Sequence, residues 1–150
     1  MQRAADKRTI LGIIEPVAFP ELGVPDILAK VDTGAYSGAI HCESIEEIVD
    51  ERTGKKALKI VPIDASRKPV IINRYAHVHA RSSSGHRSKR YIITTKIEIR
   101  GTVYDIRIGV TQRSLMNVKV LIGRRFIRKN NMLVDVTQNK ELDTDGGQKI

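Results

Sequence analysis

The chain has 150 residues and a formal net charge of +9 at pH 7. This length suits one domain with a sizeable core and is too short for two lobes of ordinary size. The one cysteine, Cys42, excludes an intrachain disulfide, and no apolar run reaches the roughly 18 residues that suggest a membrane-spanning helix. No apolar segment follows the N-terminal charges. We therefore expect a soluble, cytoplasmic protein with no membrane partner.

The net positive charge would suit nucleic acid, an anionic membrane surface or an acidic polypeptide. Its densest stretches are residues 81–90 and 124–129. Neither stretch has the interleaved aromatic residues of a platform for single-stranded nucleic acid, and no helix-turn-helix or zinc-finger spacing is present. Nucleic acid is therefore not the expected partner, and a plain solvated surface remains an alternative explanation for both stretches.

Nearly all the elements expected along the chain are strands. In chain order they cover residues 9–19, 24–31, 38–42, 57–63, 70–80, 91–100, 103–110, 118–122 and 132–136. Ser44 to Glu47 has the form of a capping box, which predicts a helical turn through Val49, and residues 124–129 could form one basic helical turn. Short strands with regular turns and almost no helical periodicity predict an all-β domain, either a closed barrel or a sandwich.

Two strand candidates carry a further signal. Residues 91–100 alternate, which predicts one buried face that carries Ile93, Thr95, Ile97 and Ile99. Residues 81–88 are polar and contain a glycine, so the flanking strands should form a long hairpin with an exposed tip. We expect residues 9–137 to form the domain, with residues 1–8 and 138–150 flexible.

The stretch with the clearest chemistry is Asp32-Thr33-Gly34, which lies between two apolar strands. Burying a carboxylate inside a strand without hydrogen-bond partners would cost about 4 kcal/mol of folding free energy. Gly34 could supply them, because a residue free to take positive φ lets successive backbone N–H groups point at the carboxylate. Taken alone, the tripeptide is also compatible with a simple Asx turn.

Several motifs together resemble the retropepsin-like aspartic proteases, and in particular a bacterial and archaeal branch often named "ATP-dependent zinc protease". They are Pro20 to Pro25, Lys30 to Ala35, Ser37 to His41, Ser84 to Arg87, Arg90 to Ile93 and Leu121 to Arg124. They span roughly residues 9–137. The chain departs from that branch at Tyr36, which replaces a basic residue, at Ser88-Lys89, which replaces an acidic pair, and at Gln112-Arg113, which replaces Asn-Arg. These departures bear on substrate preference.

The resemblance implies an all-β fold: a closed retropepsin-like barrel, equivalent to half of pepsin, with a flap hairpin and one short helix. It also implies a homodimer in which Asp32 of each subunit meets its partner and activates a water for peptide-bond hydrolysis. Thr33 would hydrogen-bond across the dimer, and Gly34 would donate a backbone N–H to the two carboxylates. No cofactor and no metal are required.

The same resemblance assigns the remaining site residues. Those that would contact substrate are Ala35 and the flap residues Ser83, Ser84, Gly85 and His86. Those that would support the active site from beneath are Leu121, Ile122, Gly123 and Arg124, with Arg124 tying the helix to a nearby acid. The basic flap and the family's association with enzymes that add glutamate tails make an acidic or poly-glutamate peptide the expected substrate.

Two alternatives remain at this stage. His77 and His79 share one side of a strand, and with His41, Cys42 and His86 they could serve a zinc-dependent hydrolase, although no His-Glu-x-x-His or paired Cys-x-x-Cys motif is present. Alternatively, the fold could be a non-catalytic dimeric module that binds an acidic polypeptide or nucleic acid.

Overall fold

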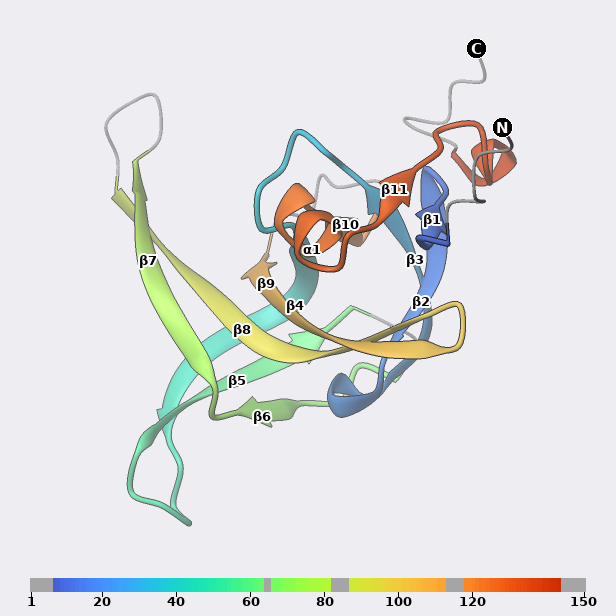
Figure 1. Cartoon of the computed structure of the whole chain (residues 1–150). Helices are drawn as coiled ribbons and strands as arrows, with labels where there is room; N and C mark the ends of the chain where they lie inside the picture. The colour runs from blue at the N-terminus through green and yellow to red at the C-terminus, as the bar shows by residue number, and fades with distance from the viewer. Residues whose placement is uncertain (1–6, 64–65, 82–86, 113–117, 144–150) are drawn as a thin grey trace, which may run out of the picture.

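A computed structural model describes residues 7–63, 66–81, 87–112 and 118–143. Within these ranges the regular structure is mostly β-strand (Figure 1). The strands are β1 (Ile10–Leu11), β2 (Ile14–Phe19), β3 (Val24–Val31), β4 (Ala39–Val49), β5 (Lys56–Pro62), β6 (Val70–Ile72), β7 (Tyr75–Arg81), β8 (Arg87–Ile99), β9 (Thr102–Thr111), β10 (Val120–Ile122) and β11 (Leu133–Val134). The helical elements are α1 (Arg124–Lys129) and two 3-10 turns, η1 (Pro20–Leu22) and η2 (Lys140–Leu142). No helix in the described part is long and apolar enough to cross a membrane.

Six strands form a closed barrel in the order β10-β3-β2-β8-β9-β4. The barrel closes because β10 pairs on both of its edges. Val120 lies opposite Ala29 in a parallel pairing with β3 and opposite Ile40 in an antiparallel pairing with β4. The predicted all-β class and the retropepsin-like barrel with one short helix are thereby confirmed.

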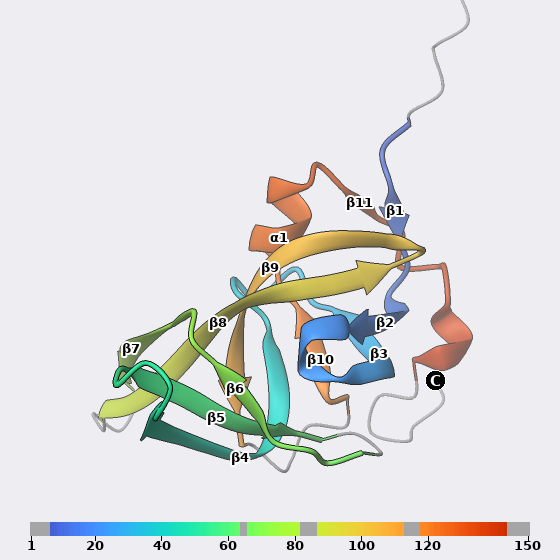
Figure 2. The same cartoon turned by 90° about the horizontal axis from the view of Figure 1, so that it is seen from below.

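Two hairpins extend beyond the barrel. β4 continues past it and pairs with β5, which in turn pairs with β6, so that these strands form a layer beside the barrel (Figure 2). β7 pairs with the first half of β8, from Tyr75 opposite Ile93 to Arg81 opposite Arg87, and this arm projects from the barrel in Figure 1. The predicted long hairpin is present, and its tip, residues 82–86, lies outside the described residues.

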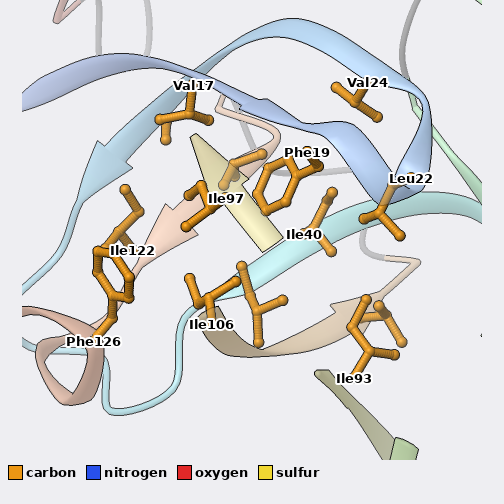
Figure 3. Close-up of a cluster of buried hydrophobic side chains, with 14 of the residues drawn as sticks. Val17, Phe19, Leu22, Val24, Ile40, Ile93, Ile97, Ile106, Ile122 and Phe126 are labelled. Carbon is orange, nitrogen blue, oxygen red and sulfur yellow. The ribbon is translucent and has the colours of Figure 1, made fainter. Parts of the chain in front are cut away.

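The core is almost entirely aliphatic, as the scarcity of aromatic residues requires. Figure 3 shows side chains from β2, β4, β8, β9, β10 and α1 meeting in one cluster. The alternation predicted for β8 is confirmed, because Ile93, Ile97 and Ile99 are no more than 1% exposed and Thr95 is 3% exposed. The return from β8 to β9 is a two-residue turn, in which Arg100 and Gly101 both have positive φ.

Two predictions of local structure were wrong. Residues 44–49 do not form a helical turn. They continue β4, because each pairs with a residue of β5, ending with Val49 opposite Lys56. Tertiary pairing here overrides a local capping signal. Residues 70–80 are not one strand, since the chain bends between Ile72 and Tyr75 and changes from the β5 layer to the β8 arm.

The described part of the predicted C-terminal tail is attached to the barrel. The N–H of Ile13 donates to the carbonyl of Gln138 at 3.0 Å, and Asn139 Nδ2 donates to the carbonyl of Ile14 at 2.8 Å. Lys30 and Asp143 form an ion pair at 3.5 Å. Gly12 permits this contact, since a Cβ there would lie 2.7 Å from the Gln138 oxygen. Residues 138–143 therefore pack as part of the domain.

An ion pair between the buried Glu15 and the exposed Arg100 joins β2 to the β8–β9 turn. Glu15 is 1% exposed, and its Oε1 accepts from Arg100 Nε at 2.8 Å and from the Gly12 N–H at 3.3 Å. The hydrogen bond to Glu15 is the main reason that the pKa of Arg100 lies above its ordinary value. The same guanidinium reaches the Gln138 side chain at 3.2 Å. One carboxylate thus joins the barrel to the C-terminal segment.

We expect Glu15→Ala to lower the free energy of unfolding by about 2 kcal/mol, because Arg100 and the Gly12 N–H lose their common acceptor. Urea unfolding measures this change. Glu98→Ala is the control: Glu98 is exposed on the same sheet, and its loss should have little effect. Equal losses in the two variants would show that the Glu15–Arg100 pair does not stabilise the fold.

Candidate active site

The Asp-Thr-Gly loop begins where β3 leaves the barrel. The Asp32 N–H donates to the carbonyl of Ile122 at 2.9 Å, which extends the β3–β10 pairing by one residue. The Gly34 N–H donates to Asp32 Oδ1 at 3.0 Å, and the Ala35 N–H donates to the Asp32 carbonyl at 3.2 Å. Asp32 is half-buried, whereas Thr33 and Gly34 are exposed. The loop therefore holds one carboxylate in a fixed position that solvent can reach.

The predicted role of positive φ was assigned to the wrong glycine. The Gly34 N–H points at the carboxylate as expected, but Gly34 is not among the glycines with positive φ. That conformation belongs to Gly38, with φ of +73°. Gly38 is where the loop turns back toward β4, so the left-handed residue closes the loop and does not present the acid.

The predicted supporting residues lie directly against this loop. A Cβ at Gly38 would be 2.2 Å from the Leu121 carbonyl oxygen, and one at Gly123 would be 2.4 Å from the Tyr36 oxygen. The Arg124 N–H donates to the Ala35 carbonyl at 2.8 Å. The fold thus brings Asp32 to Ala35 together with Leu121 to Arg124, although the two stretches lie far apart in the sequence. Their backbones cross without space for a side chain between them.

Arg124 holds the loop through its side chain as well. Its Nη1 donates to the carbonyl of Gly34 at 2.9 Å and lies 3.5 Å from that of Thr33. The guanidinium also stacks over the Tyr36 ring, 5.4 Å from its centroid. Among the described residues Arg124 thus binds carbonyl oxygens, where the sequence analysis expects an acid. Because two carbonyls of the Asp-Thr-Gly tripeptide share this cation, Arg124 restrains the peptide planes next to Asp32.

The flap residues Ser83, Ser84, Gly85 and His86 lie outside the described residues, so their contact with substrate stays a prediction. The sequence analysis missed two features of the site, the close approach at Gly38 and the stacking of arginines on Tyr36. The close approach had a weak signal in the sequence, because Gly38 is the next glycine after Asp-Thr-Gly. The second had none, because Tyr36 and α1 are brought together only by the fold.

The alternative metal ligands do not converge in the described part of the chain. No group of three or more His, Cys, Asp or Glu side chains there could hold a metal ion. His41 is 7% exposed, with no hydrogen-bond partner for its Nδ1, and Cys42 is buried in the core. His77 is exposed on β7, with its ring edge-on to Tyr91 at 6.3 Å. The side chain of His79 and all of His86 lie outside the description.

Burial also makes the Cys42 thiol a poor nucleophile. It raises the pKa of the thiol to about 12, so the thiol stays protonated at neutral pH. A nucleophilic cysteine needs the thiolate. We therefore expect iodoacetamide to leave Cys42 unmodified in the folded protein at pH 8 and to alkylate it in denaturant. Labelling at the same rate in both states would contradict this assignment.

The same pKa shift has a consequence for stability. An unfolded thiol ionises near pH 8.5, whereas the folded one ionises at about 12. The contribution of Cys42 to stability is therefore complete below about pH 8.5 and declines as the pH rises from there toward 12.

Gly38→Ala should destabilise the protein by more than about 3 kcal/mol, because the new Cβ would collide with the backbone of Leu121. Gly54→Ala is a matched control. Gly54 has φ of +70°, close to the +73° of Gly38, but nothing within 4 Å of its added Cβ. It should cost about 1 kcal/mol, the penalty of the left-handed conformation alone. Thermal unfolding compares the two, and similar losses would show that the close approach at Gly38 is unimportant.

Comparison with known proteins agrees with this geometry. The family model of the RimB-like proteins, described as retropepsin-like aspartic endopeptidase RimB, matches residues 10–143. A crystal structure of a Legionella pneumophila protein of unknown function (DUF785) superposes with a TM-score of 0.70 at 25% identity, covering 86% of this chain and 94% of that one.

Longer proteins contain a similar segment. A "Probable alpha-L-glutamate ligase" of Shewanella pealeana is 33% identical over 97% of this chain and 32% of its own length. One of Desulfotalea psychrophila is 31% identical over 85% of this chain and 28% of its own length. The chain thus spans about a third of the length of these curated relatives. Because the family model covers nearly the whole chain, the chain belongs to the family of the retropepsin-like aspartic endopeptidase RimB.

Proposed function

We propose that this protein is an aspartic endopeptidase that acts as a homodimer. The observation that carries the proposal is the loop geometry at Asp32: a half-buried carboxylate that accepts the Gly34 N–H at 3.0 Å, on a loop anchored to β10 and α1. A catalytic acid must be held firmly and must still reach water and substrate. The Asp32 loop meets both requirements.

A dimer is required because one chain supplies one Asp-Thr-Gly loop. Aspartic catalysis uses two carboxylates side by side, and Asp-Thr-Gly occurs once in the sequence. A twofold axis next to Asp32 would place the same residue of a second subunit against it. Thr33 and Gly34 are exposed at this point and would lie at the contact. Membership of a family whose members are typically dimeric supports the arrangement.

In the proposed mechanism the two Asp32 carboxyl groups share one proton, since two like charges so close cannot both ionise readily. The ionised group takes a proton from a bound water, which attacks the substrate carbonyl. The protonated group donates to the carbonyl oxygen. The Gly34 N–H stabilises negative charge on the dyad, and the flap hairpin closes over the substrate and excludes water.

The proposed substrate is an acidic polypeptide, with a glutamate-rich chain as the first candidate. The net charge of +9 favours an anionic partner. Relatives that contain a similar segment are named as glutamate ligases, which points to glutamate chemistry near this domain. We propose that the protein acts in the cytoplasm, where its unpaired, buried Cys42 would stay reduced.

The proposal is tested by cleavage of a glutamate-rich peptide library at several pH values. Asp32→Asn should reduce the rate by about a thousandfold or more, because an amide can neither share nor transfer the proton. Asp26→Asn makes the same chemical change at an exposed position of β3 and should keep full activity. A chelator should leave the rate unchanged, and loss of activity in chelator would support the zinc hydrolase instead.

Two further outcomes bear on the proposal. Activity per subunit should rise with protein concentration if the active species is a dimer, and a constant value down to high dilution would argue against a weakly associating one. If neither wild type nor Asp32→Asn cleaves any peptide while both bind acidic chains, the non-catalytic binding module is the better description.

A further inference from the structure

The surface beside the catalytic loop carries two arginines over one aromatic ring. Tyr36 follows the Asp-Thr-Gly-Ala stretch directly and is 52% exposed. The guanidinium of Arg124 lies 5.4 Å from its ring centroid and that of Arg125 lies 5.8 Å from it. Both arginines come from the first turn of α1, which lies beside this loop in Figure 1. The ring of Tyr36, four residues after Asp32 in the sequence, therefore orients two cations beside the loop.

The two arginines have different contacts. Arg124 already donates to the carbonyls of the loop. Within the described ranges, the Arg125 guanidinium has no carboxylate partner and no hydrogen bond, and its recorded contact is the stack on Tyr36. Its backbone is nonetheless fixed, since the Arg125 N–H donates to the Tyr36 carbonyl at 3.0 Å. Arg125 is thus a positioned cation with its donors available.

Arg125 also lines a small pocket between β9 and α1. The other residues of the pocket are Asp105, Ile106, Arg107, Phe126 and Lys129, and its volume is about 30 Å³. That volume exceeds the roughly 10–15 Å³ of such space that one water needs, so the pocket has room for a small polar group such as a carboxylate head. The floor is rigid, because Phe126 is buried and packs edge-on against Tyr104 at 5.6 Å.

The charges around the pocket favour an anion. Three cations line it, Arg107, Arg125 and Lys129, against the single carboxylate of Asp105. Asp105 is itself ion-paired with Lys96, which lies outside the pocket lining. The pocket therefore has an excess of positive charge. A planar guanidinium stacked on a ring is well prepared to bind a carboxylate with two parallel hydrogen bonds.

We propose that Arg125, held between Tyr36 and this pocket, is a specificity-determining residue that binds a glutamate or aspartate side chain of an acidic polypeptide lying beside the catalytic loop. The choice of a polypeptide as the ligand rests on the proposed function. Its geometry explains how a loop with an uncharged residue at Tyr36 still presents a cation to substrate: the charge comes from α1.

The test measures binding separately from cleavage. A fluorescein-labelled hexaglutamate peptide is titrated by anisotropy against the Asp32→Asn protein, with or without a second change at Arg125. Arg125→Gln should weaken binding about fivefold, the scale of one exposed charge pair, and Arg125→Lys should keep part of the affinity. A neutral peptide of equal length with Gln in place of Glu should not distinguish these variants.

Arg128→Gln is the matched control. It removes the same charge from the same helix, but Arg128 is exposed and lines neither the pocket nor the Tyr36 ring. It should change the affinity by less than about twofold. If Arg125→Gln and Arg128→Gln weaken peptide binding equally, the peptide is attracted by overall positive charge and not by a site at Arg125, which would overturn the proposal. No weakening by either would overturn it as well.

Kinetics separate this proposal from the proposed function. If wild type cleaves acidic peptides, Arg125→Gln should raise KM about fivefold for them with little change in kcat. Unchanged KM in a protein that still cleaves would refute the role of Arg125 and leave the protease intact. Absence of cleavage by wild type, with binding of hexaglutamate that depends on Arg125, would refute the protease and support the carboxylate site.

Discussion

The structure depends on one backbone crossing, where the loop that carries Asp32 passes over the end of β10. The Asp32 N–H donates to the Ile122 carbonyl, and the Arg124 N–H donates to the Ala35 carbonyl. Backbone hydrogen bonds between the two segments therefore continue beyond the ends of β3 and β10. Only glycine fits at Gly38 and Gly123, where an added Cβ would overlap a backbone oxygen. The same crossing closes the barrel, because β10 is the strand that pairs with both β3 and β4. The contacts of β10 and the residues after it therefore both close the barrel and place Asp32.

This coupling explains how a small barrel holds a carboxylate firmly at its surface. The loop is too short to pack a core of its own, so its rigidity comes from hydrogen bonds to β10 and α1 and from the Arg124 guanidinium on the Thr33 and Gly34 carbonyls. α1 is anchored in turn by Phe126, drawn beside Ile122 in Figure 3, in the aliphatic cluster. A change in the packing of α1 should thus alter the position of Asp32, because few contacts separate the two.

The same short helix links support of the acid to recognition of substrate in our interpretation. Its buried residues, Phe126 and Ile127, face the barrel, and its arginines face the loop and the solvent. Arg124 restrains the Asp-Thr-Gly tripeptide, whereas the hydrogen-bond donors of the Arg125 side chain stay available. A basic stretch for which a solvated surface is one explanation from the sequence can therefore combine two roles. The distinction depends on which neighbours the fold supplies, since the two arginines are adjacent and chemically identical.

The sequence by itself determined the strand-rich class, the long hairpin of β7 and β8 and the buried face of β8, and its motifs, through their resemblance to a known family, placed the Asp-Thr-Gly loop beside the Gly-Arg turn that precedes a helix. These features are local periodicities and short motifs, which can be identified from residues close together in the sequence. Tertiary structure alone decided that residues 44–49 extend β4, that Gly38 and not Gly34 takes positive φ, that residues 138–143 attach to the barrel, and that Arg124 and Arg125 stack on Tyr36. Each of these depends on a partner distant in the sequence, and a short-range pattern carries no record of that partner.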